Sequence, residues 1–168
     1  ASALSQIDDQ IGSVNQGLGR IGNQRNIGRE NIGNSYNSSL NKLFGDKATA
    51  QRDYETNKTD TTQGFLGSRA GLREGARNQL NNVKRLLGQA GAGSSSAYNE
   101  AAPLAIGKES NNRFEGVKSQ FLGNVGKLET QWGDTERNFG EYEKELAADK
   151  ANKERELEAG LAQTELGF

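Results

Sequence analysis

The sequence predicts an all-α protein built of long, partly broken amphipathic helices that carry coiled-coil-like seams. Apolar residues recur at alternating steps of three and four positions over long stretches, which is the spacing of one helix face. No segment alternates β-branched and polar residues as a half-buried strand does, and the chain has only four valines. A β-sheet is therefore not expected.

The N-terminal helix region, 1–45, carries the first seam. Its a and d positions run without interruption over about three heptads. They are Leu4, Ile7, Ile11, Val14, Leu18 and Ile21. Arg25 and Gly28 occupy the next two positions of the seam, so the pattern weakens there before it returns around Ile32.

The middle of the chain is more polar and is predicted to be interrupted. Residues 46–66 are interpreted as a polar linker or a weak helix, and residues 67–87 as a helix with a second apolar seam. The Gly-, Ser- and Ala-rich segment 88–105 is predicted to be a hinge, because clustered glycines and Pro103 disfavour a continuous helix.

The C-terminal region, 106–168, is predicted to be one long helix with the strongest seam. One extra residue near Val125 adjusts its register. The seam comprises Phe114, Val117, Phe121, Val125, Leu128, Trp132, Phe139, Tyr142 and Leu146. Both seams are predicted to contact other copies of the chain or a partner protein.

The composition indicates that this order depends on neighbours. Leu, Ile, Val and Phe make up about a fifth of the 168 residues, near the limit below which chains fail to bury a core. The net charge is only −1, so charge repulsion does not account for the polarity. We therefore expect the helices to be ordered by oligomerisation or by docking in a larger assembly.

The residue inventory argues against catalysis. The chain has no Cys and no His, which excludes thiolate nucleophiles, imidazole bases and zinc sites that need these ligands. No enzyme activity, cofactor or metal is expected. No apolar run is long enough for a transmembrane helix, and contact with a membrane is expected only after release from an assembly.

One basic stripe is a candidate for phosphate contact. Arg69, Arg73, Arg77 and Lys84 lie four, four and seven positions apart, which places them on one helix face. Such a face can bind nucleic-acid phosphates, or it can simply be solvated. The chain as a whole is not basic, which disfavours a dedicated DNA-binding protein.

The 22 glycines form a further pattern. Many directly follow a large apolar residue, and several are seven positions apart, as in Gly126, Gly133 and Gly140. Two interpretations remain open at this stage. The glycines form a groove for close packing of another backbone, or they reflect biased composition in a loosely constrained chain.

In its texture the sequence resembles virion proteins of tailed bacteriophages. The resemblance is carried by the Gly-, Ala-, Asn- and Gln-rich helical stretches GFLGSRAGLREGARNQLNNVKRLLGQAG and SSAYNEAAPLAIGKESNNRFEGV. It implies a multi-copy internal or ejection protein in the virion, associated with the portal or tail lumen and assisting genome delivery. The implied partners are copies of the chain and other virion proteins. The alternatives are a tape-measure-like tail component and an adaptor or scaffold that orders on a larger protein.

Overall fold

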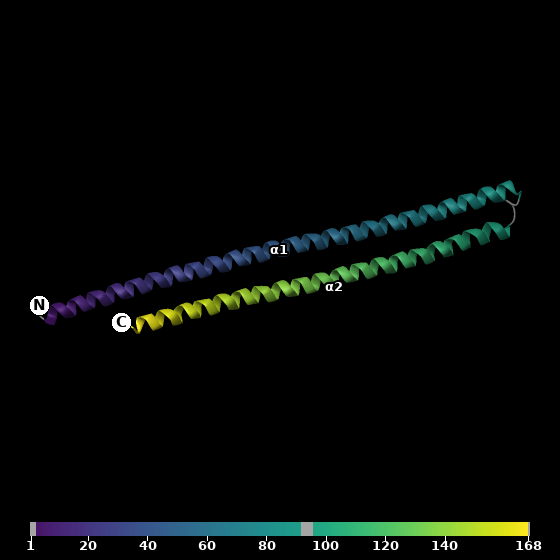
Figure 1. The fold of residues 1–168 in the computed structure, drawn as a ribbon. Coiled ribbons are helices and arrows are strands. Elements are labelled where there is room, and N and C mark those ends of the chain that lie inside the picture. Colours follow the sequence, from purple (N-terminus) through teal and green to yellow (C-terminus); the bar gives the residue numbers. More distant parts are fainter. Residues whose placement is uncertain (1–2, 92–95, 168) are drawn as a thin grey trace. The chain divides into compact units, whose positions relative to one another are not determined.

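The computed structural model describes residues 3–91 and 96–167 and confirms the all-helical prediction. Helix α1 spans Ala3–Gln89 and helix α2 spans Ser96–Glu165 (Figure 1). The described residues contain no strand. The fold class is therefore all-α, with far longer helices than the sequence pattern suggested.

Neither expected interruption appears where the structure describes the chain. Residues 46–66 lie within α1, although their side chains are mostly polar. Residues 96–105 of the expected hinge lie within α2, with Pro103 inside the helix, and residues 92–95 lie outside the described residues. Gly91, just after α1, has a φ of 70°, a conformation that glycine adopts without the penalty a side chain would bring.

The helices form two compact units. Unit 1 comprises residues 1–49 and 135–168, and unit 2 comprises residues 50–134. In each unit a segment of α1 packs antiparallel against a segment of α2. Arg25 pairs with Glu158 and Tyr36 lies at Lys150 in unit 1, whereas Tyr54 stacks on Trp132 and Phe65 on Phe121 in unit 2.

The inward face of each helix repeats every 11 residues. In α1, each member of one such series is at least half-buried: Ile21, Ile32, Leu43, Tyr54, Phe65, Ala76 and Leu87. In α2 the corresponding series is Ile106, Val117, Leu128, Phe139, Lys150 and Leu161. Eleven residues in three turns is about 3.67 residues per turn, close to the 3.6 of a straight α-helix. This period is what keeps one face turned inward over such a length.

Very little is buried. The only buried hydrophobic side chains in the described part of the chain are Ile21 and Leu161, and no polar side chain is buried there. Most seam residues are half-buried, because a pair of helices covers only one side of each. The sequence-based expectation of a thin core is consistent with these exposures.

Candidate functional site

The structure offers no enclosed chemical site among its described residues. No group of three or more acidic residues there is placed to hold a metal ion. No helix found in residues 3–91 and 96–167 is long and apolar enough to cross a membrane. The candidate functional surfaces are therefore the helix faces themselves.

The seam of unit 2 is aromatic. Tyr54 and Trp132 stack with ring centroids 5.4 Å apart and planes 14° apart. Phe65 stacks on Phe121 at 4.5 Å and lies 6.2 Å from Phe114. Such ring pairs add stabilisation beyond the area that they bury. Aromatic stacking thus supplies the specific cross-helix contacts of this unit.

Lys58 joins the two helices beside the tyrosine–tryptophan stack. Its Nζ donates hydrogen bonds to Tyr54 Oη and Glu129 Oε1, each at 3.3 Å. These hydrogen bonds raise the pKa of Lys58 above its usual 10.5, with the bond to Tyr54 contributing most. The contact is partly exposed, so its contribution to stability is small.

A shallow groove of about 350 Å³ follows the seam of unit 2 toward the end of α1. Leu72, Ala76, Leu80 and Ile106 supply apolar walls, with Pro103 beside them. Two residues of the predicted basic stripe, Arg69 and Arg73, also line it.

The basic stripe is only partly continuous in the structure. The Arg69 guanidinium lies over the Phe114 ring, 5.8 Å from its centroid, so this residue belongs to the helix interface. Arg73, Arg77 and Lys84 are exposed. The pattern of four basic residues therefore divides into one interface residue and three surface residues, and phosphate contact stays a prediction for the latter.

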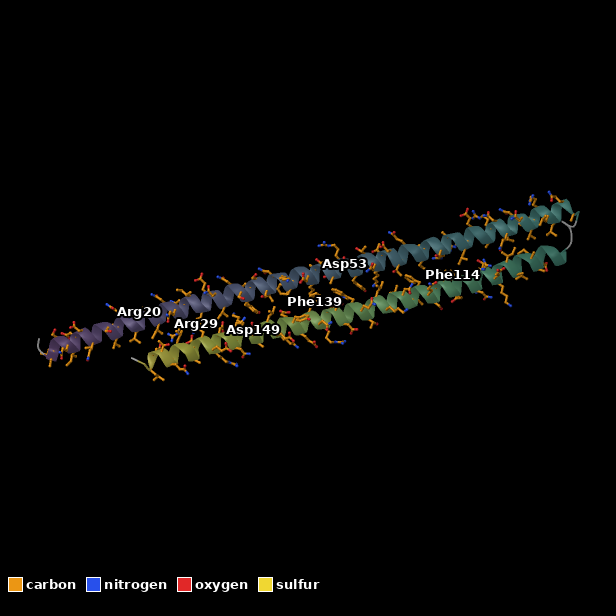
Figure 2. All side chains as sticks on the ribbon, viewed as in Figure 1. Arg20, Arg29, Asp53, Phe114, Phe139 and Asp149 are labelled. Carbon is orange, nitrogen blue, oxygen red and sulfur yellow. The ribbon has the colours of Figure 1, made fainter. Side chains whose placement is uncertain are left out.

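The seam of unit 1 is charged instead. Arg25 donates to Glu158 Oε2 at 3.1 Å and to Glu165 Oε1 at 3.0 Å, and Arg29 donates to Glu158 Oε1 at 2.7 Å. Figure 2 shows Arg29 on the part of α1 that faces α2. The bond to Glu165 and the charge of Glu158 raise the pKa of Arg25 further above its ordinary value. Sequence reasoning treated Arg25 as a flaw in the seam, whereas the structure makes it a cross-helix ion pair.

One glycine of unit 1 permits a close approach. A Cβ built on Gly28 would lie 2.7 Å from Leu157 Cδ1 and 2.8 Å from Cδ2. The leucine side chain therefore packs directly against the backbone of α1. The glycines that suggested a groove behave otherwise, since nothing lies within 4 Å of a Cβ at any of them: Gly12, Gly19, Gly116, Gly123, Gly126, Gly133 and Gly140. Within this chain, no neighbouring element fills that stripe.

The predicted seam residues fall into two groups. Phe114, Val117, Phe121, Val125, Leu128, Trp132, Phe139 and Leu146 all lie on the inward face, while Tyr142 is 58% exposed. In the N-terminal seam only Ile21 is buried. The other five are exposed: Leu4, Ile7, Ile11, Val14 and Leu18. The most regular heptad seam in the sequence is thus the one that α2 does not cover.

Compared with known protein families, curated proteins and solved structures, the chain has no significant match. The functional argument therefore depends on the residues and contacts described above.

Proposed function

We propose that this chain is a non-enzymatic structural protein that acts in several copies, packing its long helices against other molecules of a bacteriophage particle. The observation that carries the proposal is the near absence of a core. Among the described residues only Ile21 and Leu161 are buried hydrophobic side chains. A chain that covers so little apolar surface by itself gains stability from association.

The exposed apolar side chains support the same conclusion. Large hydrophobic residues with at least a third of their surface exposed occur along both helices, from Leu4 at 73% to Leu122 at 57% and Leu104 at 73%. Exposed apolar surface in this quantity is typical of proteins that bury it against a partner. A solvated, independently stable helix pair would carry polar residues at these positions.

The exposed glycines support a mechanical role. Each glycine inside a helix costs about 1 kcal/mol relative to alanine. Most of those in the structure gain no close packing in return, because a Cβ there would meet open space. The helices are therefore weaker than their length implies. A weakly held helix can unfold locally and pass through a narrow conduit more readily than a leucine-rich one.

The phage setting rests on the sequence resemblance to virion proteins. In that setting the chain is an internal or ejection protein near the portal or tail lumen, and it assists genome delivery. Exposed Arg73, Arg77 and Lys84 are the residues proposed to meet DNA phosphates there. A tape-measure-like role and an adaptor that orders on a larger protein are the remaining proposals.

The first experiment measures mass and helicity on the same sample. Light scattering behind a sizing column gives the copy number, and far-UV circular dichroism on the same peak gives the helix content. A helical oligomer is the expected result. A compact, cooperatively unfolding monomer would contradict the proposal, and a largely unfolded monomer would favour the adaptor.

The setting is tested separately by quantitative mass spectrometry of purified phage particles whose genome encodes the chain. Several copies per particle are expected. Its presence in infected cells but not in particles would contradict a virion role.

A further inference from the structure

The first four turns of α1 form a projecting segment, residues 3–18, that α2 does not reach. Arg25 pairs with Glu165, at the very end of α2, and the side chains of α1 before Ile21 lack the cover that later ones have. In Figure 1 the N-terminal end of α1 continues past the C-terminal end of α2. Its apolar residues are between 36% and 73% exposed, namely Leu4, Ile7, Ile11, Val14 and Leu18.

The period of the apolar stripe changes where α2 ends. From Ile21 onward the inward face of α1 follows the 11-residue series. Continued backward, that series would place Gln10 and Gly17 on the seam. The apolar residues are instead Ile11 and Leu18, in heptad phase. A heptad stripe favours a left-handed supercoil, whereas an 11-residue stripe favours a right-handed one. The projecting segment is therefore matched to a different helix from α2, one with a heptad stripe of its own.

The flanks of this seam select for a copy of the same sequence rather than a charged partner. The positions beside the seam are Asp8, Gln10, Asn15 and Gly17, of which only Asp8 is charged. Charged flanking residues usually determine which partner a coiled coil accepts. With a single charge there is no pattern for an oppositely charged helix to complement. The seam itself, however, is apolar throughout and is self-complementary.

The position of α2 determines the direction of pairing. α2 runs antiparallel to α1 and occupies the seam from Ile21 onward. A second copy that pairs antiparallel continues the line of α2 without displacing it. A parallel copy would bring its own α2 onto the same seam, where both would compete for the space beside Ile21.

We infer that the projecting segment is a homodimerisation surface, in which residues 3–18 of two copies pair antiparallel. The layers place Leu4 against the second copy's Val14 and Ile7 against its Ile11. This register joins a positions to d positions and leaves Ile21 to α2. The inference rests on the proposed function, because that function requires association between copies.

The test compares two double variants of the full chain by sedimentation velocity over a range of concentrations. Ile7→Gln with Ile11→Gln is expected to weaken association by roughly a hundredfold or more, because each dimer would bury four amides without partners. Leu66→Gln with Leu122→Gln removes similar exposed apolar surface, 52% and 57% exposed, from unit 2 and is expected to change nothing. Circular dichroism checks that both remain helical.

The outcomes separate this inference from the proposed function. Association that persists in the Ile7 and Ile11 variant, or that is lost equally in the control, overturns the inference but leaves self-assembly standing. A wild-type chain that stays monomeric at about 100 μM, weaker than typical specific dimers, overturns both.

Direction is tested by disulfide crosslinking, which is clean because the chain has no cysteine. Mixed Leu4→Cys and Val14→Cys chains are expected to crosslink to each other. Leu4→Cys alone is not, since its two copies would lie roughly 15 Å apart along the axis, beyond the reach of a disulfide of about 7 Å between Cα atoms. Efficient crosslinking of Leu4→Cys to itself would overturn the antiparallel arrangement.

Discussion

The two units solve one packing problem with different chemistry. Unit 2 joins its helices through stacked rings, Tyr54 on Trp132 and Phe65 on Phe121. Unit 1 joins its helices through Arg25 and Arg29 with Glu158 and Glu165. Ring stacking buries apolar area and is insensitive to salt, whereas exposed ion pairs are screened and contribute little. The comparison predicts that unit 2 is the more stable of the two.

The largest effect is expected from removing the tryptophan. Trp132→Ala deletes the stack with Tyr54 and is expected to destabilise unit 2 by about 1–3 kcal/mol, less than for a fully buried aromatic because Trp132 is only half-buried. Urea unfolding followed by circular dichroism measures the loss. Tyr142→Ala is the matched control, since this aromatic residue is 58% exposed, and it is expected to cost no more than about 0.5 kcal/mol. Equal losses would mean that stacking does not stabilise unit 2.

A pair of glycine substitutions sharpens the comparison at the level of the backbone. Gly126→Ala in unit 2 adds a methyl group to open space and is expected to stabilise the helix by up to about 1 kcal/mol. Gly28→Ala in unit 1 is expected to bring no gain, because the new Cβ would lie 2.7 Å from Leu157 Cδ1. Thermal unfolding of both variants measures the difference. A similar gain at both positions would show that Leu157 moves aside freely.

A smaller effect is expected from the ion pairs. Arg25→Ala removes both contacts to α2 and is expected to weaken unit 1 less than Trp132→Ala weakens unit 2, because these side chains are about a third exposed. Raising the salt concentration to about 1 M is expected to reduce that loss, since salt already screens the pairs in the wild-type chain. Hydrogen exchange of residues 21–32 reports on unit 1 directly. A loss independent of salt would indicate that Arg25 acts by packing its aliphatic stem.

The smallest effect is expected at alkaline pH. The pKa of Lys58 is raised in the folded chain, so its contribution is fully present below 10.5 and is lost as the pH rises through the higher folded value. Unfolding midpoints measured from pH 9 upward are expected to fall more steeply for the wild-type chain than for Lys58→Gln. Parallel curves would contradict a role for the Tyr54–Lys58–Glu129 contact.

The sequence predicted the helical class and most of the α2 seam, because large apolar residues at helical spacing mark the inward face. It did not predict continuous helices through 46–66 and 96–105. There the inward positions are Tyr54, Lys58 and Thr61 in one case, and Ala102 in the other, so the polar or small residues hid the stripe. The 11-residue period was available in the sequence, yet short heptad matches with occasional shifts conceal it. Arg25 and Gly28 could not be interpreted from one helix alone, since their partners Glu158 and Leu157 are about 130 residues away.

The 11-residue repeat makes the length of the protein adjustable in whole steps. Removing one repeat from α1 and the facing repeat from α2 shortens both by roughly 16.5 Å and returns every later residue to its former face. Removing seven residues instead would rotate the remainder of each helix away from its partner. Paired deletions of 11 are therefore expected to retain the helicity seen by circular dichroism, whereas paired deletions of seven are not. A gene for such a chain can lengthen or shorten its product by duplication or loss of a 33-base unit in each helix, with no new interface to evolve.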